Sequence, residues 1–191
     1  MKNLTSNQVE QLVTIYPFLK PINVWTGRPE EDFEDNYYVG QHDLPHGWSR
    51  LFLMYCKELR PHLIKSNIID KFYFTQVKEK YGTMRLYYSG YPASAMYLNS
   101  LYETFSYYIC QRCGCFATRE TKGWVATYCD DCISEYKGNT EAIQKHKCMQ
   151  LSCFKNGSYH MIYQTYKYLK KEYIKVMRMN HEEFFKYIIT V

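Results

Sequence analysis

The chain has 191 residues, of which 46% are hydrophobic and 23% charged, and its formal net charge is +5. This composition supports a globular core and suits one domain with an appendage or two small domains. No apolar run approaches the roughly 18 residues that a membrane-spanning helix needs. This excludes a helical membrane protein, and the absence of a secretory pattern after Met1 favours a cytoplasmic one.

Charge is distributed unevenly along the chain. Lys and Arg balance Asp and Glu over residues 1–132, so the whole positive excess lies in residues 133–191. A concentrated basic segment is a candidate for contact with phosphates or with an acidic protein surface.

The first helix is predicted over residues 6–16, with Thr5 or Ser6 as its cap and Gln8 completing a capping box. The acidic segment 30–35 that follows is either a solvated loop or a docking site for a basic partner. A second helix is predicted to start near Pro45 and Gly47, and Pro61 is expected to end or kink it. His42, Asp43 and His46 precede this helix. They are candidates for an acid–base pair or a metal site; alternatively, the aspartate caps the helix and the two histidines are exposed.

A β-hairpin is predicted over residues 70–88, with its turn at Tyr81-Gly82. Its tip carries three basic residues that are candidates for contact with phosphates: Lys78, Lys80 and Arg85. Alternatively, these charges only keep the hairpin soluble. Pro92 then opens a helix that runs into Cys110, so this helix and the segment after it are expected to be rigidly joined.

Two Cys-x-x-Cys pairs, Cys110/Cys113 and Cys129/Cys132, lie fifteen residues apart. Each pair forms a turn that aims two thiolates at one point, and Zn²⁺ takes four such ligands at about 2.3 Å. Four thiolates leave no open position for substrate, so the pattern predicts a structural zinc site. A pair of disulfides is the alternative in an oxidising compartment.

Between the cysteine pairs, residues 116–119 and 124–128 read as two short strands joined by a turn at 120–123. Such a hairpin is marginal without the metal. The segment is nearly neutral in charge, and a zinc with four thiolates adds further negative charge. This favours a structural role for the zinc ribbon over direct contact with nucleic acid.

Several of these motifs occur in a characteristic order: Gly47-Trp48, residues 76–87 containing Lys78-Glu79-Lys80-Tyr81-Gly82, and then the two cysteine pairs around Gly123-Trp124. In this order the chain resembles a small family of phage and prophage proteins of unassigned function. The resemblance covers residues 44–132. It implies a shared fold and a phage-encoded protein located in the host cytoplasm, but no activity.

The tail begins with a polar linker at 138–140. His146, Cys148, Cys153 and His160 are candidates for a second metal site, with buried thiols and surface histidines as the alternative. An amphipathic helix is predicted over 159–179, and Asn180 and Glu183 form a capping box for a last helix. The apolar faces of both helices are expected to pack on the core or on a second subunit. The basic face of the longer helix is formed by Lys167, Lys171, Lys175 and Arg178.

These elements predict an α+β fold: helices packed on a β-hairpin, with a zinc ribbon and a helical C-terminal extension. The expected segments are 1–91, 92–136 and 137–191. Three functions fit the pattern. The first is a zinc-stapled protein that binds nucleic acid or a nucleic-acid-handling complex of the host, and the second is an inhibitor or modulator of a host machine. The third, a nuclease, is least favoured, because no P-loop, convincing carboxylate pair, nucleophile elbow or open metal site is present.

Overall fold

The structure, a computed structural model, describes residues 4–23, 25–29, 38–41, 43–90, 92–143 and 159–190. The helices and 3-10 turns are α1 (Ser6–Ile15), η1 (Pro17–Leu19), η2 (His46–Trp48), α2 (Ser49–Lys65), η3 (Ala93–Ala95), α3 (Met96–Ser106), α4 (Asp130–Ile133), α5 (Tyr159–Met177) and α6 (His181–Ile189). The strands are β1 (Ile22–Asn23), β2 (Arg28–Pro29), β3 (Tyr73–Lys80), β4 (Thr83–Ser89), β5 (Arg119–Thr121), β6 (Thr127–Tyr128) and β7 (Thr140–Ala142). The predicted α+β class is therefore confirmed.

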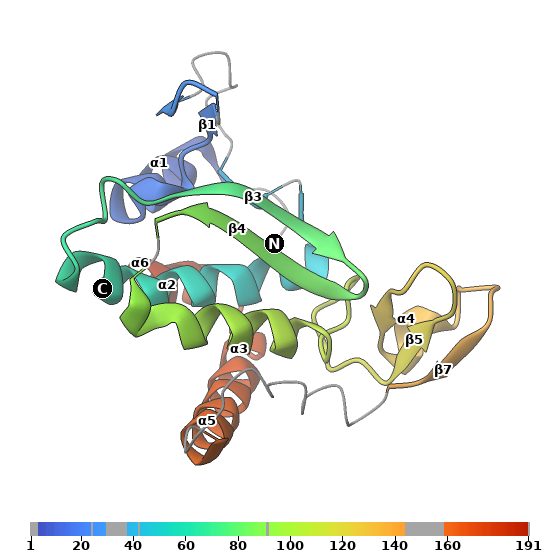
Figure 1. Ribbon diagram of the computed structural model, residues 1–191. Coiled ribbons are helices and arrows are strands. Elements are labelled where there is room, and N and C mark those ends of the chain that lie inside the picture. The colour runs from blue at the N-terminus through green and yellow to red at the C-terminus, as the bar shows by residue number, and fades with distance from the viewer. Residues whose placement is uncertain are drawn as a thin grey trace.

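Helices α2 and α3 form the central layer of the molecule, and the hairpin β3–β4 covers one side of it (Figure 1). Helices α5 and α6 both pack against α2, and α5 projects from the side that faces away from the hairpin. The small sheet, with strand order β6-β5-β7, extends beyond the end of α3 (Figure 1). Within the described residues, no helix is both long and apolar enough to cross a bilayer.

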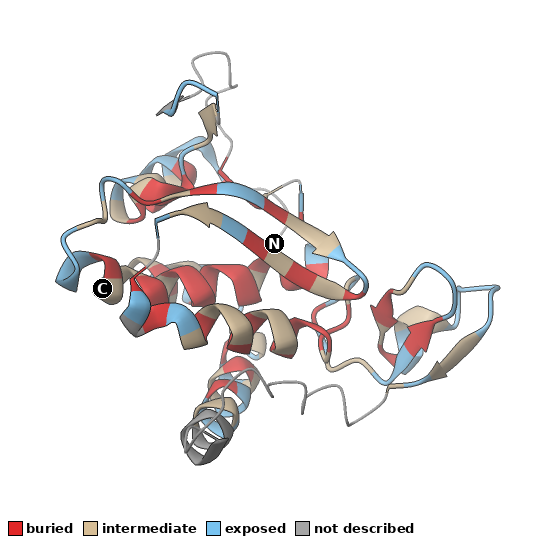
Figure 2. Ribbon diagram, viewed as in Figure 1, coloured by how far each residue is buried: buried red, intermediate tan, exposed pale blue. Residues whose placement is uncertain are grey.

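One hydrophobic core joins these layers, and its buried positions line the facing sides of the helices and the hairpin (Figure 2). Aromatic rings make up much of it: Phe18, Phe72 and Phe74 pack edge to face, and Phe105 contacts Tyr173 in the same way. The tail also contributes, through Leu169, Tyr173, Val176, Phe184 and Ile188. The prediction that the tail helices pack on the core is confirmed, and all three expected segments share that core.

Local signals in the sequence set several element boundaries. Both capping boxes form, at Thr5 with Gln8 and at Asn180 with Glu183. The β3–β4 hairpin closes at Tyr81-Gly82, where φ is +52° and +76°. Positive φ at both central residues is the geometry of a type I′ turn, whose twist matches that of the flanking strands.

The sequence left an end or a kink at Pro61 as alternatives, and the end is wrong, because helix α2 continues through Pro61 to Lys65. Proline inside a helix costs about 3 kcal/mol. Leu59 and Leu63, on either side of it, are fully buried, and burial of a leucine side chain contributes about 1.5–3 kcal/mol. Packing of the two leucines therefore outweighs the lost hydrogen bond.

The strands of the ribbon also differ from the prediction. Glu120 and Thr121, expected in a turn, lie buried within β5. Strand β5 pairs with β6 on one side and with β7 on the other, so the predicted linker at 138–140 leads directly into a third strand. The cause is tertiary: the buried Glu120 carboxylate accepts a hydrogen bond from the Tyr107 hydroxyl at the end of α3.

Candidate metal centre

The first cysteine pair lies in a tight turn that follows α3. The Gly114 N–H donates to the Cys110 carbonyl at 3.0 Å, and the Cys110 N–H donates to the Cys115 carbonyl at 2.7 Å. Gly114 has φ +82°, a conformation that glycine adopts without strain. The Cys115 N–H points at the Cys113 sulfur, 3.4 Å away. These bonds close a turn in which both thiols face the same point.

The second pair lies at the start of α4. Cys129 is extended and directly precedes the helix, and the Ile133 N–H donates to its carbonyl at 3.0 Å. Cys132 lies one helical turn further on. Outside the pair, the Asp130 carboxylate accepts a hydrogen bond from the Thr118 hydroxyl at 2.9 Å and faces Arg119. These contacts hold α4 against the start of β5.

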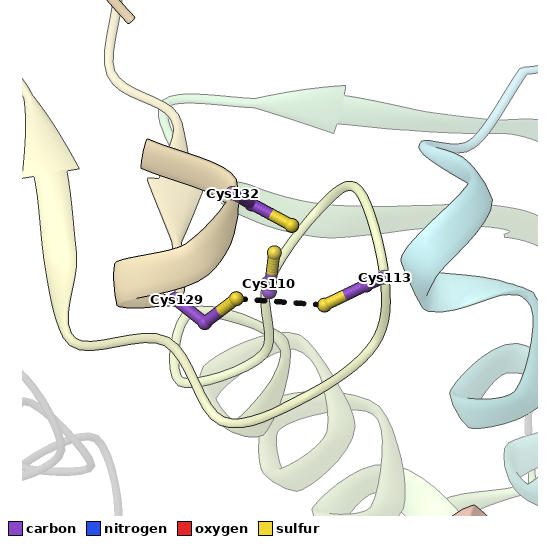
Figure 3. Close-up of side chains that lie close together, drawn as sticks. All are labelled: Cys110, Cys113, Cys129 and Cys132. Atoms are coloured by element: carbon purple, nitrogen blue, oxygen red, sulfur yellow. Dashed lines mark hydrogen bonds between the residues drawn. The ribbon is translucent and has the colours of Figure 1, made fainter. Parts of the chain in front are cut away.

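All four sulfur atoms converge (Figure 3). The Sγ atoms of Cys110, Cys113, Cys129 and Cys132 lie within 4.8 Å of one another, and those of Cys113 and Cys129 are 3.6 Å apart. Four sulfurs at about 2.3 Å from one tetrahedral ion are about 3.8 Å from each other. The donor set and its spacing therefore fit a metal ion of the size and softness of zinc.

The pKa values of the four thiols agree with a site whose thiolates need a cation to balance their charge. Burial raises the pKa of Cys110, but the backbone N–H groups around it outweigh this and bring the pKa below its ordinary value. Burial is the largest cause that raises the pKa values of Cys113, Cys129 and Cys132; hydrogen bonds with neighbouring thiols raise that of Cys132 further and act in both directions on the other two. Four thiolates repel each other unless a positive ion lies between them, and such an ion deprotonates them outright.

The first knuckle, residues Cys110–Cys115, is bonded to the helical core at several points. The Trp48 indole N–H donates to the Ile109 carbonyl at 3.0 Å, and the Gly47 N–H donates to the Gln111 carbonyl at 2.8 Å. From the tail, the Tyr173 hydroxyl donates to the Gly114 carbonyl at 2.7 Å. The knuckle thus forms part of the junction between α2, α3 and α5.

Sequence reasoning missed these supporting residues. Gly47 is needed because a Cβ at this position would lie 2.1 Å from the Cys110 carbonyl oxygen, and the knuckle could not approach α2 so closely. The Gly47-Trp48 dipeptide was visible as a motif, but nothing local connects it to a segment more than sixty residues away. Tyr173 is one position of the apolar face predicted for the helix over residues 159–179, and nothing in the local sequence distinguishes it from the others.

The basic residues of the β3–β4 hairpin are engaged in different ways. The Lys78 ammonium lies 5.3 Å from the centre of the Tyr87 ring, and the Lys80 ammonium lies 5.6 Å from that of Tyr81. Arg85 instead pairs with Glu103 at 3.2 Å. The same carboxylate accepts the Leu86 N–H, so Arg85 helps to fix the hairpin on α3.

The basic face of α5 is exposed at Lys167, Lys171, Lys175 and Arg178. The Lys175 ammonium lies 3.8 Å from the Glu172 carboxylate, a weak ion pair at the surface. Since α5 projects away from the hairpin (Figure 1), the structure separates the two predicted basic groups instead of joining them on one surface.

Some candidates lie outside the described residues. These are His146, Cys148 and Cys153 of the suggested second metal site, the side chain of His160, the acidic segment 30–35, and His42. Of the remaining thiols, Cys56 is buried in the core, where burial raises its pKa, and Cys115 is exposed beside the first knuckle. His46 lines a hollow of about 460 Å³ next to Cys132.

The chain was compared with protein-family models, with curated proteins and with solved structures. No family model matches, and neither search of proteins finds a match. The functional assignment therefore depends on the geometry of this chain.

Proposed function

We propose that the chain is a binding protein stabilised by one zinc ion, and that it acts on nucleic acid or on a complex that handles nucleic acid. The zinc ion is structural, since Cys110, Cys113, Cys129 and Cys132 fill a tetrahedral shell and leave no position for substrate. The ion holds the ribbon together and, through the first knuckle, completes the junction of α2, α3 and α5.

The observation that carries the binding proposal is the two-sided character of α5. Leu169, Tyr173 and Val176 bury one face of the helix in the core, while the lysines of the other face remain in solvent. The bond from Tyr173 to Gly114 fixes the helix against the first knuckle. The result is a rigid row of positive charges, which suits a phosphate backbone.

A protein partner with an acidic surface is the second candidate. It is favoured by exposed aromatic side chains at turns, which are typical of the central residues of protein interfaces. In this case the chain would act as an inhibitor or modulator, in keeping with the predicted resemblance to phage proteins.

The deciding experiment measures binding of the zinc-loaded protein to single- and double-stranded DNA and RNA over a series of salt concentrations. Contact with several phosphates makes the logarithm of the affinity fall steeply with the logarithm of salt concentration. Reversal of two charges on α5, Lys171→Glu with Lys175→Glu, should lower the affinity at least tenfold.

A matched control reverses two exposed lysines elsewhere, Lys20→Glu with Lys71→Glu, which line a different hollow. This variant has the same net charge as the α5 variant, so equal losses would mean that only total charge matters. No binding at low salt by the wild-type protein would contradict the nucleic-acid proposal and favour the protein partner.

A further inference from the structure

Two turns meet beside the metal centre, and each presents an exposed aromatic ring. The hairpin turn lies against the ribbon, because a Cβ on Gly82 would be 2.9 Å from Val125 Cγ1 and 3.5 Å from Thr127 Cγ2. Next to this contact in the chain, Tyr81 is 71% exposed and Trp124 is 81% exposed. The hairpin turn and this segment of the ribbon, more than forty residues apart in the chain, therefore lie side by side at the end of the hairpin that faces the ribbon (Figure 1), and each carries a large exposed ring.

Tyr81 is an unfavourable residue for its turn. Its φ of +52° lies in the left-handed region, which costs a non-glycine residue about 1–2 kcal/mol. Asn or Gly would be better suited to this position of a type I′ turn. Local strain of this kind, at a side chain that adds little to the core, is typical of a functional position.

Three lysines lie close to Tyr81 and Trp124 in the chain. The Lys80 ammonium lies over Tyr81, and the Lys78 ammonium lies over Tyr87 one strand away. Lys122, two residues before Trp124, is exposed and pairs with Glu141 at 3.5 Å. The nearby Glu79 carboxylate is engaged by the turn itself, where it accepts the Gly82 N–H at 2.7 Å. We name the group Tyr81, Trp124, Lys78, Lys80 and Lys122 the tip patch.

We propose that the tip patch binds single-stranded nucleic acid, with Tyr81 and Trp124 stacking on unpaired bases and the lysines contacting phosphates. A nucleotide carries a flat base and an anionic phosphate on one unit, so an aromatic ring beside an ammonium group matches both halves. In a duplex the base faces are covered by neighbouring bases, and exposed rings have nothing to stack on.

The lysines also distinguish a nucleic-acid partner from a protein partner. Tyr and Trp are common at the centre of protein interfaces, but Lys is depleted there. In the tip patch, the Lys80 ammonium lies over the Tyr81 ring, and Lys122 lies two residues before Trp124 in the chain. An aromatic ring beside a positive charge is the arrangement expected for a strand in which bases and phosphates alternate. This inference rests on the proposed function and specifies the ligand class and a site separate from α5.

The test uses the zinc-loaded full chain and a fluorescent deoxythymidine oligomer, with binding followed by fluorescence anisotropy at low salt. Tyr81→Asn removes the ring and keeps a residue that tolerates positive φ, so this variant is expected to fold as stably as the wild type. Trp124→Ser removes the second ring. Each substitution should weaken binding roughly tenfold, since stacking of one base contributes about that much.

A matched control is Trp25→Ser, because Trp25 is 93% exposed but lies in the turn between β1 and β2. This variant should bind as tightly as the wild type. A second substitution at this position allows stacking to be measured by tryptophan fluorescence. In Trp25→Phe, the remaining tryptophans are Trp124 and the fully buried Trp48. Quenching of the exposed fluorescence by the oligomer would then report a base on Trp124.

The outcomes separate this inference from the proposed function. If the ring variants bind like the wild type while Lys171→Glu with Lys175→Glu abolishes binding, the tip patch is overturned and the α5 proposal stands. Equal affinity for duplex and single strands would overturn the ligand class. If the wild type binds no oligomer, the tip-patch proposal is overturned and a protein partner explains the exposed rings better, while the α5 proposal is still tested by the duplexes and RNA of the salt series.

Discussion

The helical core and the ribbon are stabilised by different means. The core buries large apolar side chains from helices α1 to α3, the hairpin, and helices α5 and α6. In the ribbon, the buried side chains are small or polar: Cys110, Glu120, Thr121, Ala126, Thr127 and Cys129. Apolar burial can hold the core without a ligand, whereas a sheet of such short strands needs the metal.

The first knuckle belongs to both regions. Its cysteines face the metal site, and its backbone carbonyls accept hydrogen bonds from the Tyr173 hydroxyl of α5 and from the Gly47 N–H of η2, which directly precedes α2. Loss of the metal should therefore destabilise the outer part of the ribbon most, and the destabilisation should decrease toward the core. Four predictions test this difference, from the largest expected effect to the smallest.

The largest effect is expected from removal of the metal by a chelator, or of half its ligands by Cys129→Ser with Cys132→Ser. Zinc contributes about 10–16 kcal/mol in small zinc modules, so residues 116–143 should lose their fold while the core keeps it. Hydrogen exchange should show unprotected amides in β5, β6 and β7 and protected ones in α2 and α3. Cys115→Ser is the control, because this exposed thiol lies outside the cluster. Simultaneous loss of protection in α2 would contradict the division into two regions.

Gly47→Ala should disrupt the contact between the first knuckle and the start of α2. The added methyl would lie 2.1 Å from the Cys110 carbonyl oxygen and 2.6 Å from the Gly114 nitrogen, both of them backbone atoms. Relief of this overlap requires the knuckle to move, and we expect a loss of about 3 kcal/mol in the free energy of unfolding by urea. Gly123→Ala is the control: it has open space and φ +88°, so only backbone strain of about 1–2 kcal/mol applies. Equal effects would mean that the close approach at Gly47 is unimportant.

A pair of tyrosines sharpens the comparison. Tyr173→Phe removes the hydroxyl that donates to the Gly114 carbonyl, and Tyr16→Phe removes one that donates to the Ile188 carbonyl, each bond being 2.7 Å and buried. Each change removes the hydrogen-bond donor of a buried carbonyl and should lower the free energy of unfolding by about 1–2 kcal/mol.

Zinc affinity should separate the two variants. Only Tyr173→Phe acts on the first knuckle, so only this variant should bind zinc more weakly in a competition titration with a chromogenic chelator. If both variants bind zinc like the wild type, the bond from α5 does not support the metal centre.

The smallest effect concerns the pH dependence of the core. Burial raises the pKa of Glu58, and the nearby Glu172 carboxylate adds to this, while Tyr102 opposes it. A raised pKa means that the folded state holds the proton more tightly, so stability falls as pH rises through the folded-state pKa. Glu58→Gln removes this loss and should stabilise the protein at neutral pH by up to about 1 kcal/mol.

The measurement is the free energy of unfolding of both proteins from about pH 5 to about pH 8. The curves should diverge toward higher pH. Glu10→Gln on the exposed face of α1 serves as the control and should run parallel to the wild type. A Glu58→Gln protein that loses stability at neutral pH would show that the carboxylate is needed in its charged form.

Features encoded over a few residues were readable from the sequence. The spacing of the cysteine pairs predicted where four thiols gather, because each knuckle closes within a few residues. The capping boxes at Thr5 and Asn180 followed from local hydrogen bonding, and the hairpin turn followed from the tolerance of Gly82 for positive φ. Helix α2 is the exception: Pro61 locally disfavours a helix, but the burial of Leu59 and Leu63 keeps the helix continuous through it.

Tertiary packing decided the remaining features. It brought Gly47, Trp48 and Tyr173 to the first knuckle, added β7 to the ribbon sheet, and separated the basic face of α5 from the hairpin. It also placed the hairpin turn at Gly82 against the ribbon segment that follows Trp124. These contacts join segments far apart in the chain, and their free energy comes from many small packing terms. A local pattern shows which residues favour a helix or a turn and which can bind a metal, but it does not determine which distant segments they will contact.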